Sequence, residues 1–361
     1  MQKTSIGRRN FIKSSSIITV GTVLAPTTMS SFNILPSKPE LSKDIIGHGD
    51  YRYRVEKNWS DLNPKNHPVK NCHEMVMDRK KRLFLLTDHP KNNVLVYDKS
   101  GKLINSWTLH LKGAHGLTIH DENGSEFLYI TDPSNGRVLK TTLNGHIVLE
   151  IKNPQEAGVY SKYKPYKPTE TAIGPNGDIY VADGYGSQFI LQYNGKGEFI
   201  RKFGGDSFLQ PDKFKQAHGV ALDTRDPNNP TLICSARIKN SYKRFSLDGN
   251  YIESYYIPGA FISRPVIDGD DIYSAVCFGM EKDNYNMMMN KGFVTIMNKE
   301  NIVVSNPGGS KPKYKNGKLD LILQKEPVFK QCHDVCVDDD KNLYVCQWNA
   351  GGVYPYKLHR V

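Results

Sequence analysis

The sequence has no long apolar run, no CxxC pair among its 6 cysteines and no helical periodicity of any length. The apolar stretch 17–24 is too short to cross a bilayer as a helix, which needs about 20 residues. Without CxxC pairs, a structural zinc site of the cysteine type is not expected. Without helical periodicity, strands are the expected secondary structure. The composition, with 38% hydrophobic and 24% charged residues, is that of a globular protein.

The charge is positive but not concentrated in one stretch. The formal net charge is +11. Four of the positive charges lie in residues 1–31, which contain no acidic residue, so the rest of the chain carries +7. The sequence has no stripe of basic residues and no nucleic-acid-binding motif. We therefore expect no nucleic-acid partner, and a site that suits anionic substrates.

The N-terminus is predicted to be an export signal. Arg8 and Arg9, followed by apolar residues and Lys13, resemble a twin-arginine signal, and the short apolar stretch comes next. We predict a periplasmic or secreted protein with no transmembrane segment, and expect a monomer. The predicted division is a signal peptide at 1–31, a linker at 32–50 and a folded domain at 51–361.

The folded part consists of repeated units of four short strands. Each unit begins with one residue, here called the slot residue, at the start of an apolar strand. The third unit is the clearest, with strands near 169–173, 179–183, 189–193 and 198–203 joined by glycine-rich turns. Units of about 40–50 residues with four strands are typical of β-propeller blades. The slot residues are His73, His115, Thr169, His218, Ser263 and His333.

These units predict an all-β, six-bladed β-propeller. The sixth unit has only about three strands' worth of chain. The alternating segment 51–55 would supply its fourth strand and close the ring.

Slots two, four and six alternate around such a ring, about 120° apart. They hold His115, His218 and His333. One histidine in a channel is more often a packing residue, but three at alternating slots favour a metal. Three imidazoles with an open position are typical of a catalytic zinc site, although imidazole also suits iron and copper, and manganese stays open. His73 is a further candidate, as a fourth ligand or an acid–base group.

Two more residues are expected near the histidines. Tyr185 ends a second strand, and Arg237 takes the matching place one blade on. A tyrosine near a metal and a cation can have its pKa lowered enough to act as a base. An arginine offers a planar fork to a carboxylate. On spacing alone, both can also be rim residues facing solvent.

Six motifs resemble those of the NHL-repeat propellers, and more specifically of the peptidyl-α-hydroxyglycine α-amidating lyases. They cover most of the chain after the leader and are densest between residues 167 and 247. The motifs are Ala114-His115-Gly116-Leu117, Lys167-Pro168-Thr169-Glu170, Tyr180-Val181-Ala182-Asp183-Gly184-Tyr185, Ala217-His218-Gly219-Val220, Ser235-Ala236-Arg237 and Cys332-His333-Asp334-Val335.

This resemblance implies a six-bladed propeller enzyme that breaks the N–C bond of a hemiaminal, giving an amide and glyoxylate. Tyr185 would be the base and Arg237 a substrate-side arginine. The zinc ligands would be His115, His218 and His333. A structural calcium would be held by Asp334 with backbone carbonyls near Met75 and Leu117.

The chain departs from the family in its first blade. Where the family has an arginine, residues 87–91 contain none, and His73 has no counterpart. We therefore predict an exported, metal-dependent lyase for a small carboxylated substrate, either a peptide or an acidic saccharide. One alternative is a lyase for uronic-acid polysaccharides, since histidine, tyrosine and arginine also suit β-elimination. The other is a non-catalytic NHL-repeat module that binds a ligand or a protein.

Overall fold

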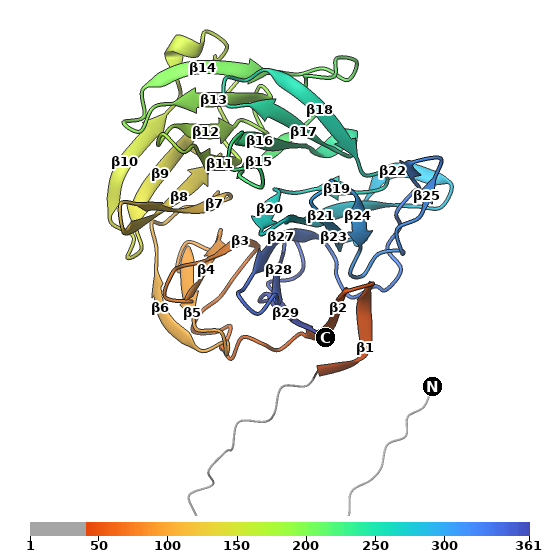
Figure 1. Ribbon diagram of the computed structural model, residues 1–361. Coiled ribbons are helices and arrows are strands. Elements are labelled where there is room, and N and C mark those ends of the chain that lie inside the picture. Colours follow the sequence, from red (N-terminus) through yellow and green to blue (C-terminus); the bar gives the residue numbers. More distant parts are fainter. Residues whose placement is uncertain (1–40) are drawn as a thin grey trace, which may run out of the picture. The chain divides into compact units, whose positions relative to one another are not determined.

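The computed structural model describes residues 41–361, so the predicted signal peptide and the first part of the predicted linker lie outside it. Six sheets are arranged as blades around a central axis (Figure 1). In the described range the only helices are two short 3₁₀ turns, η1 (Gln155–Ala157) and η2 (Arg237–Lys239). No helix in that range is long and apolar enough to cross a membrane. The prediction of an all-β, six-bladed propeller is confirmed.

The first four blades each have four antiparallel strands that follow the chain from the axis outward. Blade one is β3 (Cys72–Met77), β4 (Leu83–Thr87), β5 (Val94–Tyr97) and β6 (Leu103–Trp107). Blade two is β7 (Leu117–Glu122), β8 (Ser125–Asp132), β9 (Arg137–Thr142) and β10 (Ile147–Lys152). Blade three is β11 (Glu170–Ile173), β12 (Ile179–Ala182), β13 (Phe189–Tyr193) and β14 (Phe199–Gly204). Blade four is β15 (Ala217–Asp223), β16 (Thr231–Ala236), β17 (Ser241–Ser246) and β18 (Tyr251–Tyr256).

Blade six closes the ring with strands from both ends of the described chain. Its order is β27 (Cys332–Val337), β28 (Leu343–Gln347), β29 (Tyr356–Arg360), β2 (Tyr51–Glu56) and β1 (Leu41–His48). Strand β2 pairs with β29 from Tyr53 opposite Arg360 to Glu56 opposite Lys357. The predicted closure by an N-terminal strand therefore agrees with the structure.

The segment predicted as a linker differs in its second half, where β1 adds a fifth strand to blade six. The hairpin between β1 and β2 turns at Gly49, whose φ is 57°. A two-residue hairpin needs a positive φ at this position, which glycine adopts without strain. The glycine read as part of a linker is thus the turn of a hairpin.

Blade five is irregular. Its strands are β19 (Phe261–Ile262), β20 (Val266–Asp268), β21 (Asp271–Glu281), β22 (Asn284–Met288), β23 (Phe293–Met297) and β24 (Val303–Ser305). The short hairpin of β25 (Tyr314–Lys315) and β26 (Lys318–Leu319) lies in the long connection that follows β24. The inner strand is divided into β19 and β20, both of which pair with β21. Pro265 stands in the gap, and proline has no N–H for the sheet.

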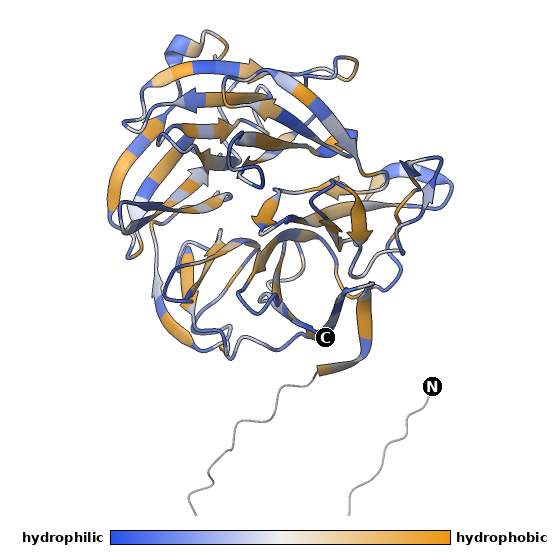
Figure 2. Cartoon of the chain, viewed as in Figure 1, coloured by the Kyte–Doolittle hydropathy of each residue, from blue (hydrophilic) through white to orange (hydrophobic). Residues whose placement is uncertain are grey.

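The hydrophobic core consists of clusters between neighbouring blades. Between blades five and six, for example, Tyr53 and Val55 of β2 pack with Tyr273, Val294 and Val335. Five similar clusters fill the other interfaces. The outer strands are partly exposed, and in Figure 2 β10 and β14 show bands of both orange and blue. Packing on both faces of each blade fixes the inner strands, and with them the slot residues, around the axis.

Candidate metal centre

The structure brings together the four slot histidines. His73 lies on β3, His115 two residues before the start of β7, His218 on β15 and His333 on β27, and all four are buried. The His115 ring centroid is 4.7 Å from those of both His218 and His333 and 5.0 Å from that of His73. Because inner strands of different blades meet at one height on the axis, residues far apart in the sequence form one cluster.

Backbone carbonyls of the next blade orient two of these rings. His115 Nδ1 lies 2.9 Å from the Thr169 carbonyl oxygen, and His333 Nδ1 lies 2.9 Å from the His73 carbonyl oxygen. A carbonyl only accepts hydrogen bonds, so each Nδ1 carries the proton and each Nε2 keeps a lone pair. Metal-bound histidines are commonly oriented in this way. The Nδ1 atoms of His73 and His218 are buried without a hydrogen-bond partner.

Tyr185 completes the histidine cluster. Its hydroxyl lies 3.0 Å from His115 Nε2 and 3.0 Å from His218 Nε2. The residue follows β12 and is 38% exposed, but its hydroxyl is directed at two buried rings. The phenol has one O–H, so it can donate to only one of these two nitrogens. Both Nε2 atoms are positions that a metal would take.

Arg237 lies next to this cluster in η2 and is buried. Its Nε donates to the Ile262 carbonyl at 3.0 Å, and its Nη2 donates to Ser263 Oγ at 2.9 Å. Burial raises the pKa of Tyr185 above its ordinary value, and the Arg237 charge opposes part of that rise. The lowered tyrosine pKa expected from the sequence is therefore not produced by the protein groups alone.

The three predicted ligand histidines are neutral at pH 7. Burial lowers the pKa values of His115, His218 and His333 well below 6.5, and the neighbouring histidines and Arg237 lower them further. Neutral imidazole is the form that binds a metal. The cluster therefore fits a metal such as zinc, which prefers nitrogen donors of this kind.

His73 extends the possible ligand set. His73, His115 and His333 each have a ring nitrogen within 4.8 Å of the others, so these three could also hold a metal. This set contains His73 in place of the predicted His218. His73 Nε2 also lies 3.6 Å from Asp88 Oδ2. Burial favours a high pKa for Asp88, but the bonds with His73 and Asn71 prevail and lower it. The pair occupies the blade in which the family's arginine is missing.

The three groups expected to hold calcium lie elsewhere. The Asp334 carboxylate and the carbonyls of Met75 and Leu117 all accept hydrogen bonds from Arg264. This arginine was not among the site residues predicted from the sequence. A feature of the sequence could have pointed to Arg264. In four of the six blades, the residue that directly follows the slot residue is charged.

The sequence of this chain is similar to those of known amidating lyases. No family model matches the chain. It is 26% identical over 272 residues to peptidyl-alpha-hydroxyglycine alpha-amidating lyase 1 of Drosophila melanogaster, covering 68% of this chain and 44% of that protein. It is 32% identical over 128 residues to a probable amidating lyase of Caenorhabditis elegans, covering 35% of this chain and 34% of that protein. The resemblance to the amidating lyases is confirmed.

Similarity to these amidating lyases extends over only part of their length, since the chain spans less than half of each. Among solved structures, a gluconolactonase from Xanthomonas campestris matches with a TM-score of 0.55 at 11% identity, covering 89% of this chain and 96% of that one. A streptogramin B lyase matches with a TM-score of 0.53 at 14% identity, covering 85% and 97%. At these identities the two structures show the propeller fold alone. The amidating lyases are thus among the relatives of this chain by sequence.

Proposed function

We propose that this protein is a metal-dependent propeller lyase similar to the peptidyl-α-hydroxyglycine α-amidating lyases. One transition metal, zinc, would be held by His115, His218 and His333, and the substrate would be a small carboxylated molecule. The observation that carries the proposal is the position of the Tyr185 hydroxyl, which contacts the Nε2 atoms of two of these histidines.

Each group of the site would have a separate role in the reaction. Zinc bound at the histidines would supply a Lewis acid that lowers the pKa of a substrate hydroxyl. Tyr185, as phenolate, would take the proton of that hydroxyl while the C–N bond breaks and the C–O bond becomes a carbonyl. The leaving nitrogen would regain the proton from the phenol, so that an amide and an aldehyde acid result. Arg237, buried beside Tyr185, would orient the substrate carboxylate through N–H groups not used by Ile262 and Ser263.

A groove outside the site supports an anionic substrate. It reaches Tyr185 and is lined in part by Lys164, Lys167 and Lys215. Lys215 is paired with Asp206 at 2.7 Å. No salt bridge is found for Lys164 or Lys167 among the described residues, so these two can attract a carboxylate. The groove suits either a peptide end or an acidic saccharide.

Metal content tests the proposal directly. We expect about one zinc per chain in the protein purified without a histidine tag, measured by elemental analysis. His73→Ala should retain the metal, because His73 faces Asp88 and the other three imidazoles suffice for a catalytic zinc site. Loss of the metal in His73→Ala would instead assign the site to His73, His115 and His333.

Metal content, together with an assay of substrate cleavage, separates the alternative functions. A protein that holds no metal, even after incubation with zinc and dialysis, would favour the non-catalytic binding module. A metal-loaded protein that cleaves uronic-acid oligosaccharides but not hydroxyglycine peptides would favour the polysaccharide lyase, since both reactions use a base and a carboxylate-binding arginine.

Export is the remaining part of the proposal, and it depends on a segment outside the described residues. We expect the native protein to accumulate in the periplasm or medium. Arg8→Lys combined with Arg9→Lys should retain it in the cytoplasm, as cell fractionation and immunoblotting would show. Unchanged export of the double variant would rule out a twin-arginine signal.

A further inference from the structure

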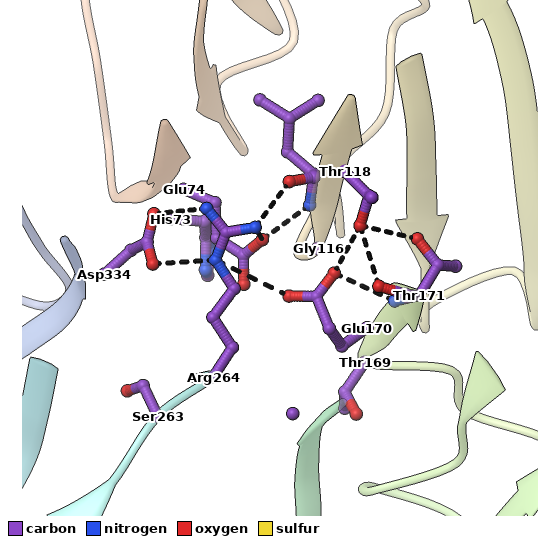
Figure 3. Close-up of polar contacts among 12 residues, drawn as sticks. His73, Glu74, Gly116, Thr118, Thr169, Glu170, Thr171, Ser263, Arg264 and Asp334 are labelled. Carbon is purple, nitrogen blue, oxygen red and sulfur yellow. Dashed lines mark hydrogen bonds and ion pairs between the residues drawn. The ribbon is translucent and has the colours of Figure 1, made fainter. Parts of the chain in front are cut away.

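A second layer of residues surrounds the axis next to the histidines. It is formed by the residues that directly follow the six slot residues: Glu74, Gly116, Glu170, Gly219, Arg264 and Asp334. The four side chains in this layer are buried and comprise one guanidinium and three carboxyl groups (Figure 3). The inner strands therefore carry an ionic layer beside the histidine layer.

Arg264 is the centre of this ionic layer. Its Nε and Nη2 donate to the two Asp334 oxygens at 2.8 and 2.9 Å, a bidentate pair. Its Nη1 donates to the Leu117 carbonyl at 2.8 Å, and Nη2 also donates to the Met75 carbonyl at 3.0 Å. Glu74 Oε2 is 3.5 Å from Nη1. One side chain from blade five thus contacts blades one, two and six.

The layer holds more acid than base. Burial raises the pKa of Glu74 well above its ordinary value, and it also raises the pKa values of Glu170 and Asp334 against the opposing charge of Arg264. One guanidinium faces three carboxyl groups, so the layer depends on Arg264 for its positive charge.

The main acceptors of Arg264 are the groups that the family resemblance assigns to calcium. A carboxylate and two carbonyl oxygens are suitable ligands for that ion. Here, however, all three accept hydrogen bonds from the guanidinium, which lies between them (Figure 3). Calcium does not fit this donor set while Arg264 is in place.

The backbone is adapted to admit the arginine. A Cβ at Gly219 would lie 2.4 Å from Arg264 Cα and 2.7 Å from its Cβ, so a side chain there is excluded. The division of the inner strand into β19 and β20 also falls at this point. Ser274 Oγ donates to the Arg264 carbonyl at 3.1 Å and holds the irregular segment.

We propose that Arg264 is a built-in replacement for a structural divalent cation, so that this propeller joins its blades at the axis without calcium. The guanidinium supplies the positive charge that the buried oxygens need, and its planar geometry satisfies four acceptor positions on three other blades. The proposal concerns the fold and holds whatever reaction the histidine site performs.

Calcium titration of the wild type and two variants tests this proposal. For the wild type we expect the same Tm in EGTA and in millimolar calcium, and no bound calcium by elemental analysis. Arg264→Ala should lower Tm by roughly 10 °C in EGTA, because it leaves buried carboxyl groups without their partner. Calcium should then restore part of that loss, since the freed oxygens form an ion site. Adding Asp334→Asn to Arg264→Ala should abolish the restoration.

Two outcomes would contradict the proposal that Arg264 replaces a structural calcium ion. One is a wild type that carries about one calcium per chain and loses stability in EGTA, and this measurement decides even if Arg264→Ala does not fold. The other is a folded Arg264→Ala variant whose Tm does not respond to calcium, which would mean that the freed oxygens are no cation site. Neither measurement depends on zinc or turnover, so the proposed function and this proposal can fail separately.

Discussion

Replacing His115 or His218 by alanine should remove the metal and the turnover together while the propeller remains folded. Each replacement takes away one of three nitrogen donors, and two imidazoles do not form a stable zinc site. Metal content should fall from about one per chain to near zero. Turnover of a hydroxyglycine peptide should fall by about 10³-fold or more, because a metal contributes several kcal/mol to stabilising developing charge.

The folding cost of these replacements should be small. The His115 replacement removes the hydrogen bond from Nδ1 to the Thr169 carbonyl, worth about 1–2 kcal/mol, and the contact of Nε2 with the Tyr185 hydroxyl. The His218 replacement removes only the contact of Nε2 with the Tyr185 hydroxyl, since His218 Nδ1 has no partner among the described residues. Circular dichroism and thermal unfolding would check this. A variant that keeps turnover at the wild-type rate would contradict a catalytic metal at these residues.

His120→Ala is a matched control for the metal-site variants. His120 lies on β7, the inner strand of the same blade as His115, but it is outside the histidine cluster and lines a separate cavity with Thr171 and Leu222. Its replacement should leave metal content and turnover unchanged. Loss of metal there would mean that the blade, rather than the donor set, had been damaged.

The arrangement of the blades could be predicted because their turns and slots repeat. In the third blade, for example, Gly177 adopts a φ of 83° in the turn between β11 and β12, at the place where the sequence required a positive φ. The repeat also placed His115, His218 and His333 in one cluster. Register on the inner strands is set by burial, so a residue at the same place in each repeat lies at the same height.

What could not be predicted depends on contacts between blades. The pairing of β1 with β2 was hidden because residues 41–48 lack a clear strand alternation. The position of the Arg264 side chain depends on the irregular pairing in blade five, where Pro265 interrupts the inner strand. No periodic pattern signals such a gap. The orientation of His73 toward Asp88 likewise depends on a loop after β4, and loops are not fixed by strand spacing.

Replacing Tyr185 by phenylalanine should keep the metal and reduce kcat by about 10²-fold or more. The change removes one oxygen and retains the ring, which packs edge-on against His115 with centroids 5.0 Å apart. The histidines should therefore remain in place, and zinc should stay near one per chain. A structural role for the phenol would instead appear as a loss of metal or of thermal stability, with kcat among the remaining loaded molecules unchanged.

The pH profile distinguishes a base from a group that only positions the substrate. Burial raises the pKa of Tyr185, so the phenol stays protonated through the neutral range unless a bound metal lowers its pKa. A base acts only when deprotonated, so the kcat of the wild type should rise with pH up to the pKa of the phenol and then level off. Tyr185→Phe should lose this rise. Tyr163→Phe, in the same groove but 89% exposed, should retain both the rise and the rate. If the profiles of Tyr185→Phe and the wild type had the same shape, the proton would have to pass to another group, and His73 with Asp88 would be the pair to replace next.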